Sequence, residues 1–463
     1  MSSSYSARLA EWGGNQRFED LPQDILTLTK LRILDVIGVA LPSIGTAFGR
    51  SVYGAVLRMG TGEESTVLGY GTRMPAQLAA LVNGALAHEF EFDDTHNETA
   101  IHVSSPVVAA SLAVCEAGCL AGRELIAAVA AGNEIVCRIG IAAPGEFYKS
   151  GYHPTGIVGA FGATYAVCRL LGLDPARTAH AAGIAGSMTS GSMQSWSDGA
   201  SAKSLHPGLA AQSGITAARL AAAGVTGPDE VFEGRWGFFH QHVREPGYRF
   251  DYERMLSGLG REWESRRISF KPYPTGHLFH AFLDAARKFY EDGLRPDQIA
   301  KITCRIADYM VPIVAEPRAE KIRPATTWHG RVSMQFSLAE VFTYGKLDLE
   351  SYNPERLRNP ALLDLASRVE CEVDDNAPGR EQWRGWVVVE TVDGRRLEHI
   401  QPFNHGSPQN PMTADEIEQK FEANARAAIG PERTAEIIRR VRVLEQERDA
   451  GEIVRLCSAI PGV

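Results

Sequence analysis

The stretch LIAAVAAGNEIVCRIGIAA, residues 125–143, decides the fold class of this chain together with two stretches before it, LAALVNGALAHEF (78–90) and VVAASLAVCEAGCLA (107–121). Alanine favours helix, and its small side chain lets neighbouring helices approach closely. Membrane-spanning helices have a similar content of Ala and Gly, but polar residues are embedded in these stretches and their flanks, among them Glu116, Glu124, Asn133 and Glu134. Such groups are costly in lipid, so the stretches predict helices buried in a mainly α-helical globular fold.

On either side of these alanine-rich stretches, the pattern of apolar residues predicts further helices toward both ends of the chain. Between residues 21 and 40, apolar residues recur at intervals of three, which is typical of an amphipathic helix. Near the C-terminus, Thr413 and Glu416 form a capping box that predicts the start of another helix. We therefore expect residues 1–264 and 403–463 to form one all-helical domain.

The pattern changes near residue 265. KITCRIADYMVPIV (residues 301–314) is rich enough in β-branched residues to predict a strand. WVVVETVDGRRLEHI (386–400) contains two extended runs around Asp393 and Gly394, a pair typical of a tight hairpin. Residues 265–402 are therefore expected to form a smaller α/β domain.

Length and charge restrict the class of protein. A chain of 463 residues is too long for one core and predicts two or three domains. A net charge of -9 argues against binding to nucleic acid or to an anionic membrane, since both need a basic face. The first residues, MSSSYSARLAEWGGNQ, lack a basic segment followed by an apolar one, so we expect a cytoplasmic protein.

The cysteine pattern indicates reduced core thiols. The seven cysteines are an odd number and are scattered among apolar residues. Cys115 and Cys119 could share a helix face, but no second pair or nearby histidine completes a metal set. We expect no metal and no cofactor.

The densest polar segment runs from His88 to His96 and continues with His102. So many titratable groups are costly to bury unless they are functional. A solvated loop between two helices is the structural alternative. Paired aspartates beside histidines also suggest a magnesium site, but no second acidic motif supports it.

Three further segments carry candidate residues. Each one alone could be an ordinary turn or surface loop. They are Gly-Tyr-His-Pro around His153, Lys-x-x-His-x-Gly with Lys203 and His206, and Lys-Pro-Tyr-Pro beginning at Lys271.

Together with the Phe-Asp-Asp-Thr run that ends at Thr95, these motifs occur in the order found in the MmgE/PrpD superfamily, which the chain resembles over nearly its whole length. The superfamily includes 2-methylcitrate dehydratases, cis-aconitate decarboxylases and iminodisuccinate epimerases. The resemblance implies a large all-helical domain built from both chain ends and a smaller α/β lid domain with a cleft between them. It also implies a homodimer and a small anionic carboxylate substrate.

The resemblance also implies the residues of the pocket. His102 is expected to transfer a proton, with His153 as a second acid or a substrate ligand. Lys203 and Lys271 are expected to bind carboxylates and to stabilise an enediolate-like intermediate. The remaining residues of the pocket are expected to bind the substrate, namely Glu91, Thr95, His206 and Phe336. Glu91 and Thr95 could instead orient His102.

Three departures from the family pattern affect the predicted reaction. Glu91 stands where aspartate is usual, the interval from Thr95 to His102 is one residue longer than in cis-aconitate decarboxylase, and Phe336 stands where that enzyme has a tyrosine. These departures favour a cofactor-independent dehydratase like the 2-methylcitrate enzyme. Epimerase and decarboxylase activities stay open, as does a binding protein without turnover. His277 and His280 are expected to be structural.

Overall fold

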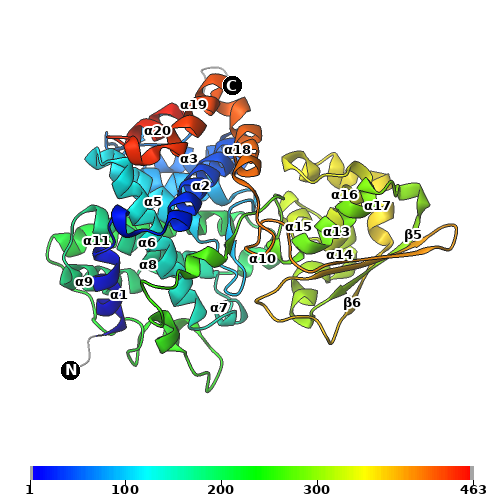
Figure 1. Cartoon of the computed structure of the whole chain (residues 1–463), viewed down its shortest axis with the longest axis horizontal. Helices are drawn as coiled ribbons and strands as arrows, with labels where there is room; N and C mark the ends of the chain where they lie inside the picture. The colour runs from blue at the N-terminus through cyan, green and yellow to red at the C-terminus, as the bar shows by residue number, and fades with distance from the viewer. Residues whose placement is uncertain (1–3, 459–463) are drawn as a thin grey trace. The chain divides into compact units, whose positions relative to one another are not determined.

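The computed structural model describes residues 4–458, and they form two compact units (Figure 1). Of the described residues, 4–89, 93–268 and 413–458 belong to unit 1, and 90–92 and 269–412 belong to unit 2. From the sequence, the boundaries are expected between residues 264 and 265 and between residues 402 and 403. Helices dominate and strands are few, so the predicted mainly α-helical fold is confirmed.

Unit 1 is built around the alanine-rich helices that the sequence predicts. The central helices are α4 (Ala76–His88), α5 (Ser104–Gly118), α6 (Gly122–Ile141), α8 (Pro154–Leu170) and α11 (Ala202–Ala222). Helices α4 and α11 meet at two glycines. A Cβ added at Gly84 would lie 2.8 Å from the Cα of Gly208, and one added at Gly208 would lie 2.0 Å from the carbonyl oxygen of Leu81. No larger residue fits at this contact, so the two helix backbones touch.

Both ends of the chain contribute to unit 1, as predicted. The flanking helices are α1 (Tyr5–Gly14), α2 (Gln23–Ala40), α3 (Ala47–Val56), α7 (Glu146–Lys149), α9 (Pro175–Gly186), α10 (Gln194–Asp198), α12 (Phe238–His242), α18 (Ala414–Ile429), α19 (Pro431–Arg442) and α20 (Gly451–Leu456). Thr413 caps α18 with Glu416, which confirms the predicted capping box. Helix α18 packs on α2, where Lys420 Nζ lies 2.7 Å from Asp35 Oδ1 (Figure 1). Short strands complete the unit, namely β1 (Ser65–Thr66), β2 (Arg73–Met74) and β3 (Thr95–His96), and β4 (Ile268–Ser269) spans the boundary.

Unit 2 contains a four-stranded sheet in the order β6-β5-β7-β8. Its strands are β5 (Ile299–Ile306), β6 (Val369–Val373), β7 (Gly385–Thr391) and β8 (Arg396–Gln401). Strand β5 runs parallel to β6 and antiparallel to β7. Gly394, with φ of 84°, turns the predicted hairpin between β7 and β8. The expected strand over 301–314 ends at Ile306, because the chain turns into helical geometry at Asp308–Met310 and continues so through Val311–Ala315.

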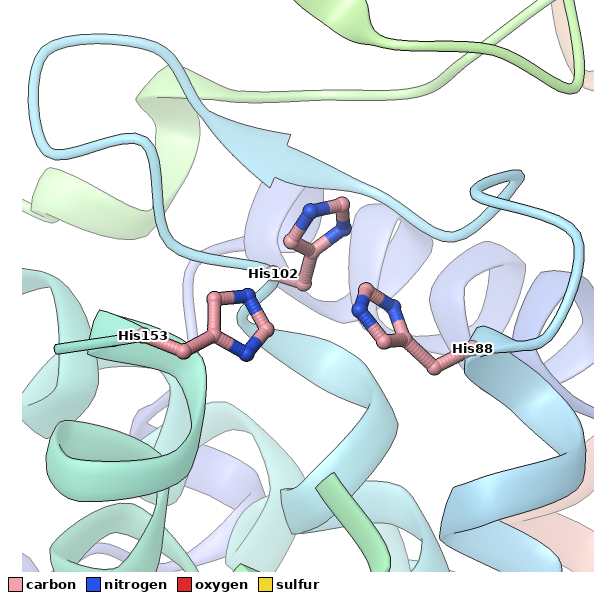
Figure 2. Close-up of side chains that lie close together, drawn as sticks. All are labelled: His88, His102 and His153. Atoms are coloured by element: carbon pink, nitrogen blue, oxygen red, sulfur yellow. The ribbon is translucent and has the colours of Figure 1, made fainter. Parts of the chain in front are cut away.

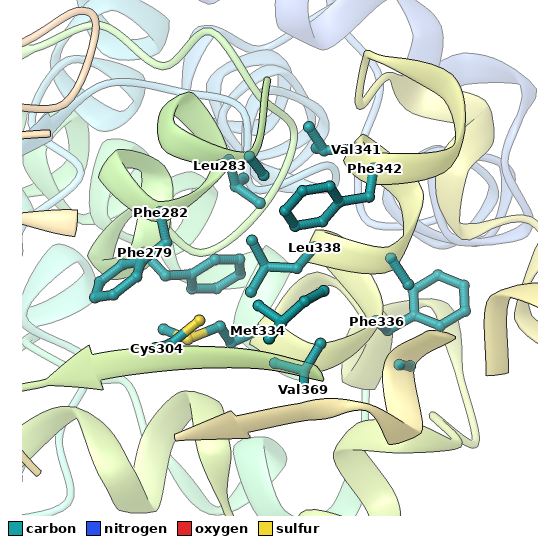
Figure 3. Close-up of a cluster of buried hydrophobic side chains, with 14 of the residues drawn as sticks. Phe279, Phe282, Leu283, Cys304, Met334, Phe336, Leu338, Val341, Phe342 and Val369 are labelled. Atoms are coloured by element: carbon teal, nitrogen blue, oxygen red, sulfur yellow. The ribbon is translucent and has the colours of Figure 1, made fainter. Parts of the chain in front are cut away.

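Aromatic and aliphatic side chains form the core of unit 2 between the sheet and its helices (Figure 3). The helices are α13 (His280–Glu291), α14 (Arg318–Ile322), α15 (Thr327–Arg331), α16 (Met334–Tyr344) and α17 (Pro360–Ser367). Phe279, Phe282 and Phe342 lie in this core. Large side chains therefore fill unit 2, whereas small ones bring the helices of unit 1 together.

Two sequence expectations concern the whole chain. Across residues 4–458, no single helix has both the length and the apolar content to span a membrane; one pair, Gln23–Gly45 and Ala47–Val56, passes together but is bent by 94°. All seven cysteines lie in the described part of the chain outside any disulfide; five of them are buried, whereas Cys119 is exposed and Cys371 is half-buried, so these two are not the core thiols that the sequence predicts.

Candidate active site

Five buried side chains from separate segments gather in unit 1 and form what we call the histidine cluster. His88 ends α4, Asp93 follows in the next loop, His102 lies just before α5, His153 is the N-cap residue of α8, and Lys203 is the second residue of α11. Figure 2 shows the three imidazole rings turned toward one another. The ring centroid of His88 lies 4.4 Å from that of His102 and 5.4 Å from that of His153.

Asp93 holds two of the histidines through one carboxylate. Its Oδ1 lies 2.9 Å from Nδ1 of His88 and 3.0 Å from Nδ1 of His102. The hydroxyl of Ser105 donates to Oδ2 at 2.6 Å. Because an ionised carboxylate can only accept, both Nδ1 atoms carry a proton. Nε2 is therefore the ring nitrogen of His102 that Asp93 leaves available for proton exchange.

Lys203 fixes the same tautomer of His88 from the other side. Its Nζ lies 2.8 Å from Nε2 of His88, and an ammonium group can only donate. The contact depends on the close approach of α4 and α11, since the two residues lie on these helices. The result is a continuous buried string, Lys203, His88, Asp93 and His102.

The surrounding charges keep Asp93 ionised. Burial alone would raise the pKa of this carboxyl group, but its interactions with His102 and His88 hold the pKa of Asp93 well below its usual range. A buried carboxylate thus lies one imidazole ring away from the buried ammonium group of Lys203. The cluster carries charges of both signs away from water.

Asp94 positions the backbone next to His102. Its carboxylate accepts from the N–H of Ser104 at 3.0 Å and also from the Ser104 hydroxyl. The N–H of His102 itself donates to the hydroxyl of Thr155 at 3.0 Å. Burial raises the pKa of Asp94 to about 6, although the charge of Arg32 and the hydrogen bonds from Ser104 lower it. The two consecutive aspartates therefore have different tasks: one orients rings and the other orients main chain.

His153 and His206 form a second pair. Their Nδ1 atoms lie 3.0 Å apart, so one of them donates to the other. Burial, followed by the charge of Lys203, holds the pKa of His153 well below its usual range. Burial and Lys203 also lower the pKa of His206, to about 3. Both rings are therefore neutral near pH 7, and Nε2 of His153 is buried with no hydrogen-bond partner among residues 4–458.

Lys271 and Glu91 lie together in unit 2. The buried Nζ of Lys271 donates to the carbonyl oxygen of Glu91 at 2.8 Å and lies 3.6 Å from its Oε2. Glu91 has φ of 54°, a left-handed conformation uncommon for a residue with a side chain. Lys271 thus anchors the 90–92 segment in a strained conformation. The carboxylate that the structure brings to His102 is that of Asp93, whereas the side chain of Glu91 contacts Lys271.

Two predicted substrate-binding residues occupy different surroundings. Thr95 is buried in unit 1, two residues after Asp93, and its hydroxyl has no hydrogen-bond partner in the described chain. Phe336 lies in the apolar core of unit 2, with its ring centroid 6.1 Å from that of Tyr352. Substrate binding by Thr95 and Phe336 stays a prediction.

His88 and Asp93 were not singled out by the sequence interpretation. Both belong to the dense polar segment that begins with the last residue of α4. That density is the sequence signal by which the two residues could be found. The spacing of five residues between them crosses the end of a helix, so no helical periodicity links them. Only the fold shows that Asp93 turns back to His88 and also contacts His102.

The histidine cluster also has the composition of a metal site. In the described chain, His88, His102 and His153 each offer a ligand atom, and these atoms lie within 4.8 Å of one another. Nζ of Lys203, however, lies 2.8 Å from Nε2 of His88. A metal ion bound to that nitrogen would have to displace the ammonium group.

Comparison with known proteins gives consistent matches along the chain. The MmgE/PrpD N-terminal domain matches residues 7–251, and the MmgE/PrpD C-terminal domain matches residues 273–446. The cis-aconitate decarboxylase-like protein oryM of Aspergillus oryzae is 28% identical over 98% of this chain and 97% of its own length. Cis-aconitate decarboxylase of Aspergillus terreus is 27% identical over 98% of this chain and 96% of its own length. The human cis-aconitate decarboxylase is 26% identical over 83% of this chain and 80% of its own length.

Proposed function

Since the chain belongs to the MmgE/PrpD family, we propose that it is an enzyme, a lyase that removes carbon dioxide from a small unsaturated tricarboxylate such as cis-aconitate. The relatives named as cis-aconitate decarboxylases support this choice of reaction over the dehydration that the sequence alone favours. The observation that carries the proposal is the buried string of Lys203, His88, Asp93 and His102.

The first requirement of such a reaction is a cation near the developing charge. When a β,γ-unsaturated acid loses carbon dioxide, the electron pair of the broken bond is delocalised toward a remaining carboxylate. A preorganised donor that meets this charge is typically worth about 3–4 kcal/mol. Lys203 is suited to this task because its ammonium group is buried and already held by His88.

The second requirement is a proton delivered to carbon. His102 can supply it through Nε2, because Asp93 holds the proton of its Nδ1. Loss of carbon dioxide followed by protonation balances without an oxidant or a reductant, so the reaction needs no redox cofactor. His153 is proposed as a substrate ligand rather than a second acid, because burial and the charge of Lys203 hold its pKa well below the usual range and keep the ring neutral.

Lys271 is proposed to bind a substrate carboxylate. Its ammonium group is buried, and the carboxylate of Glu91 lies 3.6 Å away. A bound carboxylate could share this ammonium group with Glu91. A homodimer is also proposed, and the mass of the native particle in solution tests it.

Dehydration of a 2-methylcitrate-like substrate is the second candidate reaction. Phe336 stands in the place of the decarboxylase tyrosine and cannot donate the hydrogen bond of a tyrosine hydroxyl, which counts against decarboxylation and keeps dehydration open. Proton abstraction next to a carboxylate needs the same pair of groups, a base such as His102 and a cation such as Lys203.

Proton NMR in deuterated buffer tests the proposal. The purified protein is incubated separately with cis-aconitate, 2-methylcitrate, citrate, malate, tartrate and iminodisuccinate. We expect cis-aconitate to lose a carboxyl group and its product to gain one deuterium at carbon. A new alkene from 2-methylcitrate or citrate would replace decarboxylation by dehydration, and deuterium uptake without a new skeleton would indicate an epimerase. No change in any of the six compounds would contradict the proposed substrate class.

A further inference from the structure

Three buried imidazoles form a potential nitrogen-donor site within the histidine cluster. The ligand atoms of His88, His102 and His153 lie within 4.8 Å of one another, and the three rings face one another (Figure 2). Three imidazoles around one ion are typical of sites for zinc and its neighbours in the first transition series. A tetrahedral zinc site places nitrogen ligands about 3.3 Å apart, so the rings need to move by about 1 Å.

The surroundings of the three rings match those of metal-binding histidines. Metal-ligating histidines usually bind a carboxylate or another acceptor through the ring nitrogen that does not hold the metal. Asp93 contacts Nδ1 of both His88 and His102, and His206 contacts Nδ1 of His153. The remaining nitrogen of His153, Nε2, is buried without a hydrogen-bond partner among residues 4–458.

One feature opposes metal binding, the ammonium group of Lys203. Its Nζ lies 2.8 Å from Nε2 of His88, where a zinc ion on that nitrogen would also lie. We propose that the histidine cluster binds a transition-metal ion such as Zn²⁺ only in competition with the ammonium group of Lys203, and that the bound ion inhibits the enzyme. The binding step depends on geometry alone, whereas the inhibition rests on the proposed function.

The choice of ion follows from the donors. Magnesium and calcium prefer oxygen ligands, and the only carboxylate in the cluster, that of Asp93, is occupied by two ring nitrogens and Ser105. Zinc accepts three imidazoles and leaves a fourth position for water or a substrate carboxylate. The same nitrogens cannot hold zinc and transfer a proton, so occupancy by zinc excludes turnover.

Direct zinc binding tests the site without any use of turnover. The full-length protein, stripped with a chelator and then desalted, is titrated with zinc chloride by calorimetry. We expect one zinc ion per chain. Lys203→Met keeps the length of the side chain but removes its charge, and it should tighten zinc binding by at least about tenfold. His153→Gln should weaken binding by at least about tenfold, since one of three ligands is lost.

Lys149→Met is the matched control, because Lys149 is an exposed lysine that pairs with Glu146 outside the cluster. Its zinc affinity should equal that of the unchanged protein. Circular dichroism identifies any variant that fails to fold, and Co²⁺ bound to the unchanged protein should show the visible absorption of a tetrahedral nitrogen site. Absence of stoichiometric zinc, or equal affinity in Lys203→Met, would overturn the competition.

Turnover separates this inference from the proposed function. Zinc added to the unchanged protein should abolish decarboxylation, and a chelator should restore it. If zinc binds as expected but no compound in the NMR panel reacts, the metal site stands and the proposed function fails. If the enzyme turns over and zinc raises its rate, the inhibitory role is overturned.

Discussion

Each unit of the molecule contains a buried pair of histidines in ring contact, and the two pairs differ in what surrounds them. In unit 1 the ring centroids of His88 and His102 lie 4.4 Å apart, and in unit 2 those of His277 and His280 lie 4.6 Å apart. Burial and ring spacing are therefore almost the same. Any difference in chemistry must come from the groups that the rings contact.

The two pairs differ in the hydrogen-bonding groups that their rings contact, which are a shared carboxylate in unit 1 and an amide and a backbone carbonyl in unit 2. The first pair shares the carboxylate of Asp93. In the second pair, Nε2 of His277 lies 2.9 Å from the amide nitrogen of Asn404, and Nε2 of His280 lies 3.3 Å from the carbonyl oxygen of Thr275. Amides and carbonyls hold a ring in place but exchange no proton near pH 7. The comparison indicates that burial and ring spacing do not distinguish the two pairs, whereas the shared carboxylate of Asp93 does.

The strongest test of this difference exchanges one histidine from each pair. His102→Gln should lower kcat for the substrate found by NMR by about a thousandfold, in keeping with the loss of a general acid–base. His280→Gln should leave kcat within about threefold and lower the melting temperature instead. Steady-state kinetics and thermal unfolding of both variants measure these effects. An inactive but stable His280→Gln protein would show that the histidine pair of unit 2 is also needed for activity, and the proposed difference between the two pairs would be wrong.

The two units also contain buried lysines in opposite surroundings. Lys203 donates to an imidazole, whereas Lys321 donates to the carbonyl oxygens of Ile313 and Val332 at 2.7 Å and 2.8 Å. Burial lowers the pKa of Lys321 to about 8. We expect Lys203→Ala to lower kcat by at least about a hundredfold through the loss of one preorganised donor.

Lys321→Met is the counterpart of that variant. It leaves two carbonyl groups without their donor and should reduce the free energy of unfolding by about 1–3 kcal/mol, with kcat unchanged. Urea unfolding and steady-state kinetics separate the two outcomes. Near-normal turnover in Lys203→Ala would show that the lysine motif has been assigned to the wrong role.

The sequence predicts the helical elements well because they depend on local composition. The alanine-rich stretches, the Thr413 capping box and the Asp393-Gly394 hairpin are signals contained in a few adjacent residues. The strand predicted over 301–314 is too long, because the composition stays β-branched beyond Asp308–Met310, where the backbone turns into helical geometry.

The site is harder to predict because its contacts join distant segments. Motif order alone singled out His102, His153, Lys203 and His206, which lie together in unit 1. Asp93 lies inside the Phe-Asp-Asp-Thr motif, but an aspartate in an acidic run carries no mark of its partners, so the motif assigns it no role. The sequence predicts a catalytic role for Lys271 and substrate binding or orientation of His102 for Glu91, and their mutual contact joins residues 180 positions apart in the chain.

Helix packing in unit 1 offers a smaller test, because α4 and α11 carry His88 and Lys203. Gly84→Ala would place a Cβ 2.8 Å from the Cα of Gly208 and push the helices apart. We expect kcat to fall by about tenfold, since small misplacements of catalytic groups are costly. The free energy of unfolding should fall by about 1–3 kcal/mol. Gly54→Ala in α3, where a new Cβ meets no atom within 4 Å, should keep kcat and stabilise the helix slightly.

The smallest expected effect separates the pH response of unit 2 from that of the histidine cluster. Burial raises the pKa of Glu340 to about 7, and the charge of Arg356 only partly offsets this. A carboxyl group whose folded pKa lies above its unfolded value contributes stability that is complete below about pH 4.5 and is lost as the pH rises through about 7. The melting temperature of the unchanged protein should therefore fall by about 2–4 °C more than that of Glu340→Gln between pH 5 and pH 8.

The pH profile of kcat should be the same in both proteins, because Glu340 pairs with Arg356 in unit 2 and has no part in the string from Lys203 to His102. A shifted pH profile of kcat in Glu340→Gln would mean that Glu340 affects the ionisation of the histidine cluster, and the pH responses of the two units would then not be separate.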